Sequence, residues 1–259
     1  MKYFRVWKQL ANLAISSYFS NRIDTFSYFL GKIIRFVFFL VFIIAIFNYT
    51  DRFAGYDKNE MILFYLTFNL LDTLAQAFFR GIYIFKNDVR TGNFDFLISK
   101  PINSLFYSLS RMVDILDIVL IVPLAILIAY YADLAQILTL SNLLFYLMFI
   151  VLGLLVAIGF HIISASFVIL FIESESFIWL YRDLLAIGRF PPEAFSSIIQ
   201  VIFTYVIPIF IITAFPAKAL LGMLDFETVI FTLVYVFGFF TLSILIWNKS
   251  LKHYSSASS

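Results

Sequence analysis

The sequence predicts an all-α polytopic membrane protein with six transmembrane helices. Of its 259 residues, 63% are hydrophobic and 13% are charged, whereas soluble globular proteins carry about 25% charged residues. The apolar residues form runs long enough to cross a hydrocarbon core of about 30 Å as helices. Since no polar block is long enough to fold separately, we expect residues 1–259 to form one transmembrane domain.

Residues 1–25 are predicted to form an interfacial helix before the first crossing. Apolar side chains recur at helical spacing from residue 2 to about residue 20, with Trp7 among them, while Lys2 and Arg5 fall on the other side. Such a helix lies in the headgroup plane, with its bases toward anionic lipid. The alternative is an ordinary amphipathic start to the first span.

Long apolar runs predict the crossings themselves. The first is expected at about 29–49, with two basic side chains near its start that can reach the interface. Further crossings are expected at about 61–85, 105–131, 143–172 and 228–247. The longest polar, charged segment within the apolar chain separates the second run from the third.

The path between residues 173 and 226 has two interpretations. Hydropathy places a fifth span at about 197–215 and leaves Arg182 and Arg189 in a cytosolic loop. In the alternative, crossing begins at residue 177, breaks at Pro191–Pro192, and the segment 190–222 contains a re-entrant hairpin buried in protein, because irregular backbone at membrane depth must be so buried. Both interpretations give six crossings.

The distribution of Lys and Arg predicts the orientation. With the N-terminus inside, most of the 18 basic residues lie in cytosolic segments or at cytosolic helix ends. The outside then holds Arg52, Lys58 and Lys218. By the positive-inside rule, both termini and the segment 86–100 are cytosolic.

One face of the second span is polar. Asn69, Asp72, Thr73, Gln76 and Arg80 follow helical spacing. Polar groups in a membrane usually face the bundle interior or a wet cavity. This face is therefore a candidate substrate path, and hydrogen bonds that hold the bundle together are the alternative.

The start of the third span carries Arg111, Asp114 and Asp117 at steps of three residues. Two carboxylates at this spacing are compatible with Mg²⁺, but a basic residue lies beside them and no second acidic cluster is evident. We therefore expect a structural ion pair between Arg111 and Asp114 on one helix face and no bound metal. A membrane-embedded enzyme acting on lipid-linked phosphate through the two carboxylates is the alternative function.

An ion-coupled carrier that uses Asp72 and His161 is a further alternative. The sequence has no phosphate-binding loop, nucleophile elbow, H-E-x-x-H motif or dinucleotide fingerprint. We therefore expect no catalytic residues and no enzymatic activity. Nothing indicates a nucleic-acid partner.

Four segments in register give the sequence a resemblance to a known family. They are VRTGNFDFLISKP after the second span, RFPPEAF, VIPIFIITAFPAKALLG before the last span, and WNKSLKHYSSAS in the tail. Together they resemble ABC-2 type permeases, in particular an uncharacterised bacterial branch with six spans. The resemblance covers essentially the whole chain and implies the ABC-2, or type V exporter, fold.

The resemblance also implies partners and a location. Such permeases pair as two identical or related subunits in the lipid of a bacterial or archaeal cytoplasmic membrane, and two cytosolic ABC ATPase subunits bind ATP and Mg²⁺. Coupling segments dock on those ATPases. By the resemblance, these correspond here to Asp88, Arg90, Gly92, Phe94, Asp95 and Phe96, and to a turn with Glu173 and Glu175.

The residues of the first coupling segment agree with that role. A turn is predicted at Gly92, so that short helices on either side of it present Phe94 and Phe96 as anchors for a partner groove. The resulting hypothesis is an ATP-driven permease subunit that exports an amphipathic or lipid-like substrate.

Overall fold

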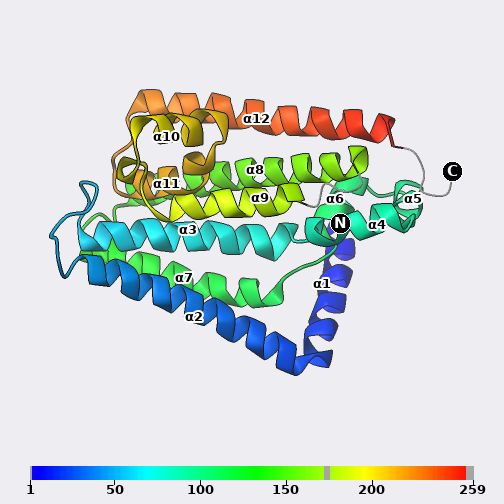
Figure 1. The fold of residues 1–259 in the computed structure, drawn as a ribbon, viewed down its shortest axis with the longest axis horizontal. Helices are drawn as coiled ribbons and strands as arrows, with labels where there is room; N and C mark the ends of the chain where they lie inside the picture. The colour runs from blue at the N-terminus through cyan, green and yellow to red at the C-terminus, as the bar shows by residue number, and fades with distance from the viewer. Residues whose placement is uncertain (1, 172–175, 255–259) are drawn as a thin grey trace.

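The computed structural model describes residues 2–171 and 176–254, which are folded almost entirely into helices (Figure 1). Within this part of the chain no strand is formed. Among the described residues, five helices are long and apolar enough to cross a membrane, and one bent helix pair raises the number to as many as six. The predicted class, an all-α polytopic membrane protein, is confirmed.

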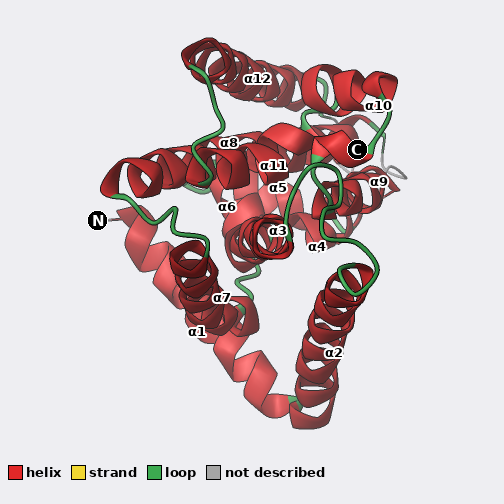
Figure 2. Ribbon diagram, turned by 90° about the vertical axis from the view of Figure 1, so that its left-hand side faces the viewer, coloured by secondary structure: helices red, strands yellow, loops and turns green. Residues whose placement is uncertain are grey.

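Helix α1 (Lys2–Ser20) runs at a steep angle to the long helices, at the end of the molecule that also holds the end of α12 (Figure 1). Helix α2 (Arg22–Ile46) begins before the predicted first span and covers residues 29–46 of the predicted 29–49. Figure 2 shows α2 standing apart from the bundle. Ile43 is its one fully buried residue, and many of its large apolar side chains are exposed, as expected for a surface that faces lipid or another subunit.

Helix α3 (Lys58–Phe79) lies in the middle of the bundle (Figure 2). A capping box begins it, because the Asp57 carboxylate accepts from the backbone N–H of Glu60 and the Glu60 carboxylate accepts from the N–H of Asp57. The predicted second span extends as α4 (Ile82–Arg90) after a small break at Gly81. Here the backbone of α6 (Ser104–Ser110) comes so close that a side chain on Gly81 would meet the Ser108 carbonyl.

The predicted third span is interrupted. Helix α6 ends at Ser110, and residues 111–114 lie outside both α6 and α7 (Ile115–Leu134). Asp114 is extended and caps α7 through the N–H groups of Leu116 and Asp117. The prediction of one continuous helix over 105–131 is wrong at this point. The cause is the cap, since a residue that caps a helix has non-helical backbone angles.

Helix α8 (Leu140–Leu170) is the fourth crossing, and α9 (Ser176–Leu185) returns along it into the 3₁₀ turn η1 (Ala186–Arg189) (Figure 1). After a second 3₁₀ turn, η2 (Pro192–Ala194), helix α10 (Ser197–Val201) runs into the π-helical turn η3 (Ile202–Val206). Helix α11 (Ile209–Leu220) follows at a bend of 100°.

Helices α10 and α11 lie together at the end of the molecule opposite α4 (Figure 1). Helix α11 is almost completely buried, which satisfies the requirement for irregular backbone at membrane depth. The break near Pro191 agrees with the second predicted path. The bent pair that follows has the geometry of a broken span or of a re-entrant loop, so the re-entrant hairpin stays a prediction. Neither Arg182 nor Arg189 lies in a loop.

Helix α12 (Phe226–Lys252) completes the fold and packs mainly along α8. The core lies where α8 meets α11 and α3. There Gly153 of α8 permits close approach, because a Cβ at this position would be 2.9 Å from the Ile212 carbonyl oxygen. Leu71 of α3 reaches the same place, with its Cδ2 3.4 Å from that Cβ position, so α3, α8 and α11 meet there.

Candidate functional site

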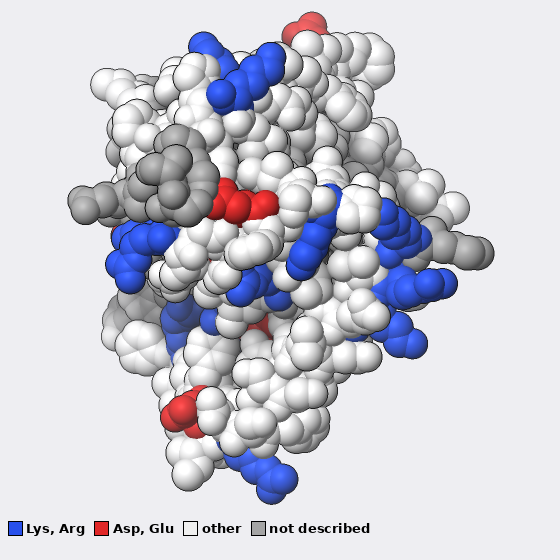
Figure 3. Space-filling view, turned by 90° about the vertical axis from the view of Figure 1, so that its right-hand side faces the viewer, with Lys and Arg blue, Asp and Glu red and all other residues white. Residues whose placement is uncertain are grey.

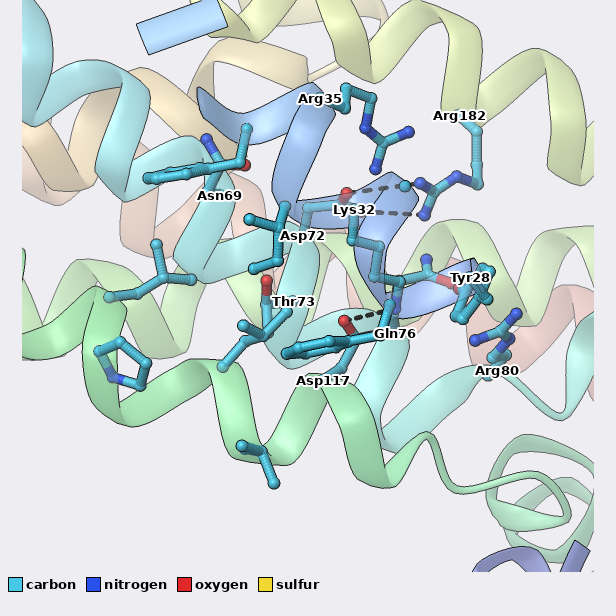
Figure 4. Close-up of a pocket in the computed structure, with 18 of the residues that line it drawn as sticks. Tyr28, Lys32, Arg35, Asn69, Asp72, Thr73, Gln76, Arg80, Asp117 and Arg182 are labelled. Carbon is cyan, nitrogen blue, oxygen red and sulfur yellow. Dashed lines mark hydrogen bonds and ion pairs between the residues drawn. The ribbon is translucent and has the colours of Figure 1, made fainter. Parts of the chain in front are cut away.

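A cavity of about 840 Å³ lies between α2, α3, α7 and α9. The predicted polar face of α3 lines it, so that Asn69, Asp72, Thr73 and Gln76 are brought together (Figure 4). Arg80, one turn further along, also lines it. The helical spacing thus correctly indicated a shared polar surface, and a role in transport stays a prediction.

The two walls of the cavity differ in character. The α7 wall carries Asp117 near its start and is apolar beyond it, with Val119, Leu120, Pro123, Leu124 and Leu127. The opposite walls, from α2, α3 and α9, carry most of the charged side chains. An apolar wall facing a few placed polar groups is typical of a binding pocket for a small amphipathic molecule.

Helix α9 contributes the guanidinium of Arg182, a residue that one of the two predicted paths placed in a cytosolic loop. Arg182 donates from both terminal nitrogens to the two carboxylate oxygens of Asp72, at 2.9 and 3.3 Å (Figure 4). A bidentate pair of this kind fixes geometry as well as charge. The available signal was Asp72 itself, since a carboxylate inside a span requires a partner.

The predicted ion pair between Arg111 and Asp114 is not formed. Asp114 is fully buried and instead pairs with Arg80 and, at 3.2 Å, with Lys32, while Arg111 pairs with Asp88. Because the chain leaves helical geometry between positions 111 and 114, the two side chains do not share a helix face. Each therefore finds a partner on another element.

A lysine occupies the space between the two carboxylates considered as metal ligands. The Lys32 ammonium lies 2.6 Å from Asp117 and 3.2 Å from Asp114. In the part of the chain that the structure describes, no three His, Asp or Glu side chains are grouped closely enough to hold a metal ion. His161 lies elsewhere, fully buried on α8, with Nδ1 2.8 Å from the Ala157 carbonyl oxygen and its ring against Phe79 and Tyr181.

The polar segment after α3 forms two short helices, as predicted. Helix α4 ends at Arg90, Gly92 takes a left-handed conformation at φ 74°, and α5 (Asn93–Ile98) follows. Glycine suits this turn because it tolerates positive φ. Arg90 and Phe96 are exposed, with Phe96 69% accessible, while Asp95 is partly buried.

Two residues of the predicted coupling surface are structural. Phe94 is fully buried against Phe85, Trp247 and Tyr254, so it cannot anchor a partner. Asp88 is buried as well, in its pair with Arg111. Sequence reasoning missed these roles because the partners come from the distant α12 and from α6–α7. The second predicted coupling turn, with Glu173 and Glu175, lies outside the described residues.

The ring packing around Phe94 includes Tyr254, which follows α12 and lies outside the membrane spans. Burial, with Asp95 nearby, raises the pKa of the Tyr254 phenol to about 12. Tyr254 is therefore neutral at physiological pH and acts as an aromatic packing group at the end of the chain.

Comparison with known proteins identifies the family. The model of the ABC-2 family transporter proteins matches residues 33–258, a match that begins within α2 and includes all later helices. No curated protein and no solved structure matches the chain significantly. ABC-2 membrane domains are the permease components that associate with ABC ATPases. The chain is a multi-pass membrane protein that belongs to the ABC-2 transporter family.

Proposed function

We propose that the chain is the permease subunit of an exporter and moves an amphipathic, lipid-like substrate across a cytoplasmic membrane. Two separate ATPase subunits power it, and a second permease subunit, identical or related, completes the transporter. ATP and Mg²⁺ bind to the ATPases, and this chain performs no covalent chemistry. Family membership carries the proposal.

The orientation we propose places the end with α1, α4 and α5 in the cytosol. Lys and Arg side chains are spread over this face (Figure 3). Since basic residues favour the cytosolic side, both termini are cytosolic. The exposed Arg90 and Phe96 then lie where an ATPase docks.

The position of the cavity agrees with loading from the cytosolic side, which is the first step of the proposed export. Its lining residues come from the parts of α2, α3, α7 and α9 that lie toward the α4–α5 end. In the proposed orientation a substrate therefore enters from the cytosol or the inner leaflet. The apolar α7 wall facing charged walls suits a molecule with a hydrocarbon part and a polar part.

Site-directed crosslinking tests the proposal, because the chain contains no cysteine. We expect Asn93→Cys and Phe96→Cys to crosslink to a cysteine in the docking cleft of an ABC ATPase from the same operon, with ATP changing the yield. Ser141→Cys, exposed at the opposite end, is the matched control. No crosslink from α5 and no effect on ATPase activity, with both proteins present in the membrane, would overturn the proposal.

A further inference from the structure

The cavity contains more positive than negative charge. Together with a smaller hollow that shares Arg35, Asn69, Asp72 and Arg182 with it, the cavity brings five basic side chains close to three carboxylates of the described chain. The bases are Lys32, Arg35, Arg80, Arg182 and Arg189, and the acids are Asp72, Asp114 and Asp117. Two positive charges are therefore left over.

The ion pairs show which bases lack a carboxylate. Arg182 is paired with Asp72, and Lys32 and Arg80 share Asp114 and Asp117. Arg35 and Arg189 form no ion pair with any described residue. Both guanidiniums line the smaller hollow next to Asp72 and Arg182, whose volume of about 30 Å³ has room for an oxygen-sized group, and Arg35 also lines the large cavity.

Arg189 is held without being neutralised. Its guanidinium lies over the rings of Phe39 and Phe68, 5.2 and 5.5 Å from their centroids. Such contacts orient the group but leave its charge and most of its N–H donors available. Figure 4 shows the Arg35 and Arg182 guanidiniums pointing into the same part of the cavity.

Uncompensated charge within a membrane-spanning region is costly and marks a functional site. Guanidinium groups match phosphate and carboxylate oxygens in two-pronged geometry. We propose that Arg35 and Arg189 bind the anionic group, a phosphate or carboxylate, of an amphipathic lipid whose hydrocarbon part lies against the α7 wall. This inference rests on the proposed function and names the substrate class for the same site.

Quenching of Trp179, which lines the cavity, measures the binding directly. The full chain with Trp7 and Trp247 replaced by Phe is placed in phosphatidylcholine nanodiscs that contain brominated phosphatidylglycerol or, in a second arm, brominated phosphatidylcholine. We expect stronger quenching by the anionic lipid, and apparent affinity about tenfold weaker in Arg35→Gln and Arg189→Gln, because a charge-assisted hydrogen bond is lost. Lys218→Gln, at the opposite end, is the control and should keep the preference.

The remaining arms separate other sources of negative charge. Arg35→Lys, which keeps the charge, should retain part of the preference, whereas a misfolded variant would lose quenching by both lipids. Equal quenching by both lipids, with a change in Trp179 fluorescence when millimolar inorganic phosphate is added, would identify free phosphate and overturn the lipid assignment. Equal quenching by both lipids with no response to phosphate would overturn the site, and would point to an acidic residue of a second subunit as the counter-ion.

This assay needs no ATPase, so its failure is distinct from failure of the proposed function. A chain that crosslinks to its ATPase through α5 but shows no anionic-lipid preference keeps the exporter function and loses the anion site. A chain that shows the preference but never engages an ATPase has a lipid site outside an exporter.

Discussion

Replacing Asp72 by Asn removes the carboxylate that accepts two hydrogen bonds from Arg182, at 2.9 and 3.3 Å. Breaking a buried ion pair costs about 3–5 kcal/mol, whereas exposed pairs contribute about 0–1 kcal/mol. The Arg182 and Asp72 side chains keep 20% and 17% of their surface accessible. We therefore expect the free energy of unfolding to fall by about 2–3 kcal/mol, below the fully buried value.

A double-mutant cycle in mixed micelles, followed by equilibrium unfolding with SDS, measures this coupling. Asp72→Asn and Arg182→Gln should each be destabilising, and the double variant should lose about as much as either single variant, because no lone charge remains. Lys218→Gln is the matched control, since its pair with the more exposed Glu193 should contribute less than about 1 kcal/mol. Strictly additive losses, or single variants as stable as the control, would refute the reasoning.

Three further predictions concern the rest of the fold. Gly81→Ala should destabilise the protein by about 1–3 kcal/mol, since its Cβ would overlap a backbone carbonyl of α6; Gly238→Ala, which meets nothing within 4 Å, should be neutral or slightly stabilising in the same unfolding assay. Phe94→Ala should cost about 3–5 kcal/mol, while Phe96→Ala should leave stability unchanged and reduce stimulation of the partner ATPase; the reverse pattern would contradict the burial of the two rings. Hydrogen bonds from Thr228, in the first turn of α12, lower the pKa of Asp225. The contribution of this cap to the free energy of unfolding should therefore be complete above the unfolded pKa of about 4 and be lost as pH falls through the lower folded pKa. If Asp225→Asn leaves the pH dependence of acid unfolding unchanged, the cap makes no such contribution.

Sequence patterns were sufficient where the determining interactions are local. Hydropathy located the long spans, and the spacing of Asn69, Asp72 and Gln76 identified the helix face that lines the cavity. The turn at Gly92 followed from glycine's tolerance of positive φ.

Other features depend on partners far away in the chain, which spacing does not reveal. Asp72 and Arg182 are 110 residues apart, and Phe94 is buried because α12 returns to cover it. The pairing of Arg111 with Asp114 was mispredicted because the interruption of the helix depends on the cap and on contacts with α3, including the hydrogen bond from Asp114 N–H to the Ala77 carbonyl.

The aromatic cluster around Phe94 has a mechanical consequence. Its ring lies 5.1 Å from that of Tyr254 and 6.3 Å from that of Trp247, measured between centroids, so α5 and the end of α12 are packed as one unit. Close-packed interiors transmit strain, and the 27 residues of α12 extend for about 40 Å. A force that a docked protein applies to α5 therefore acts on a stiff helix, whose other end lies at the opposite end of the molecule, beside the bent pair that ends in α11 (Figure 1).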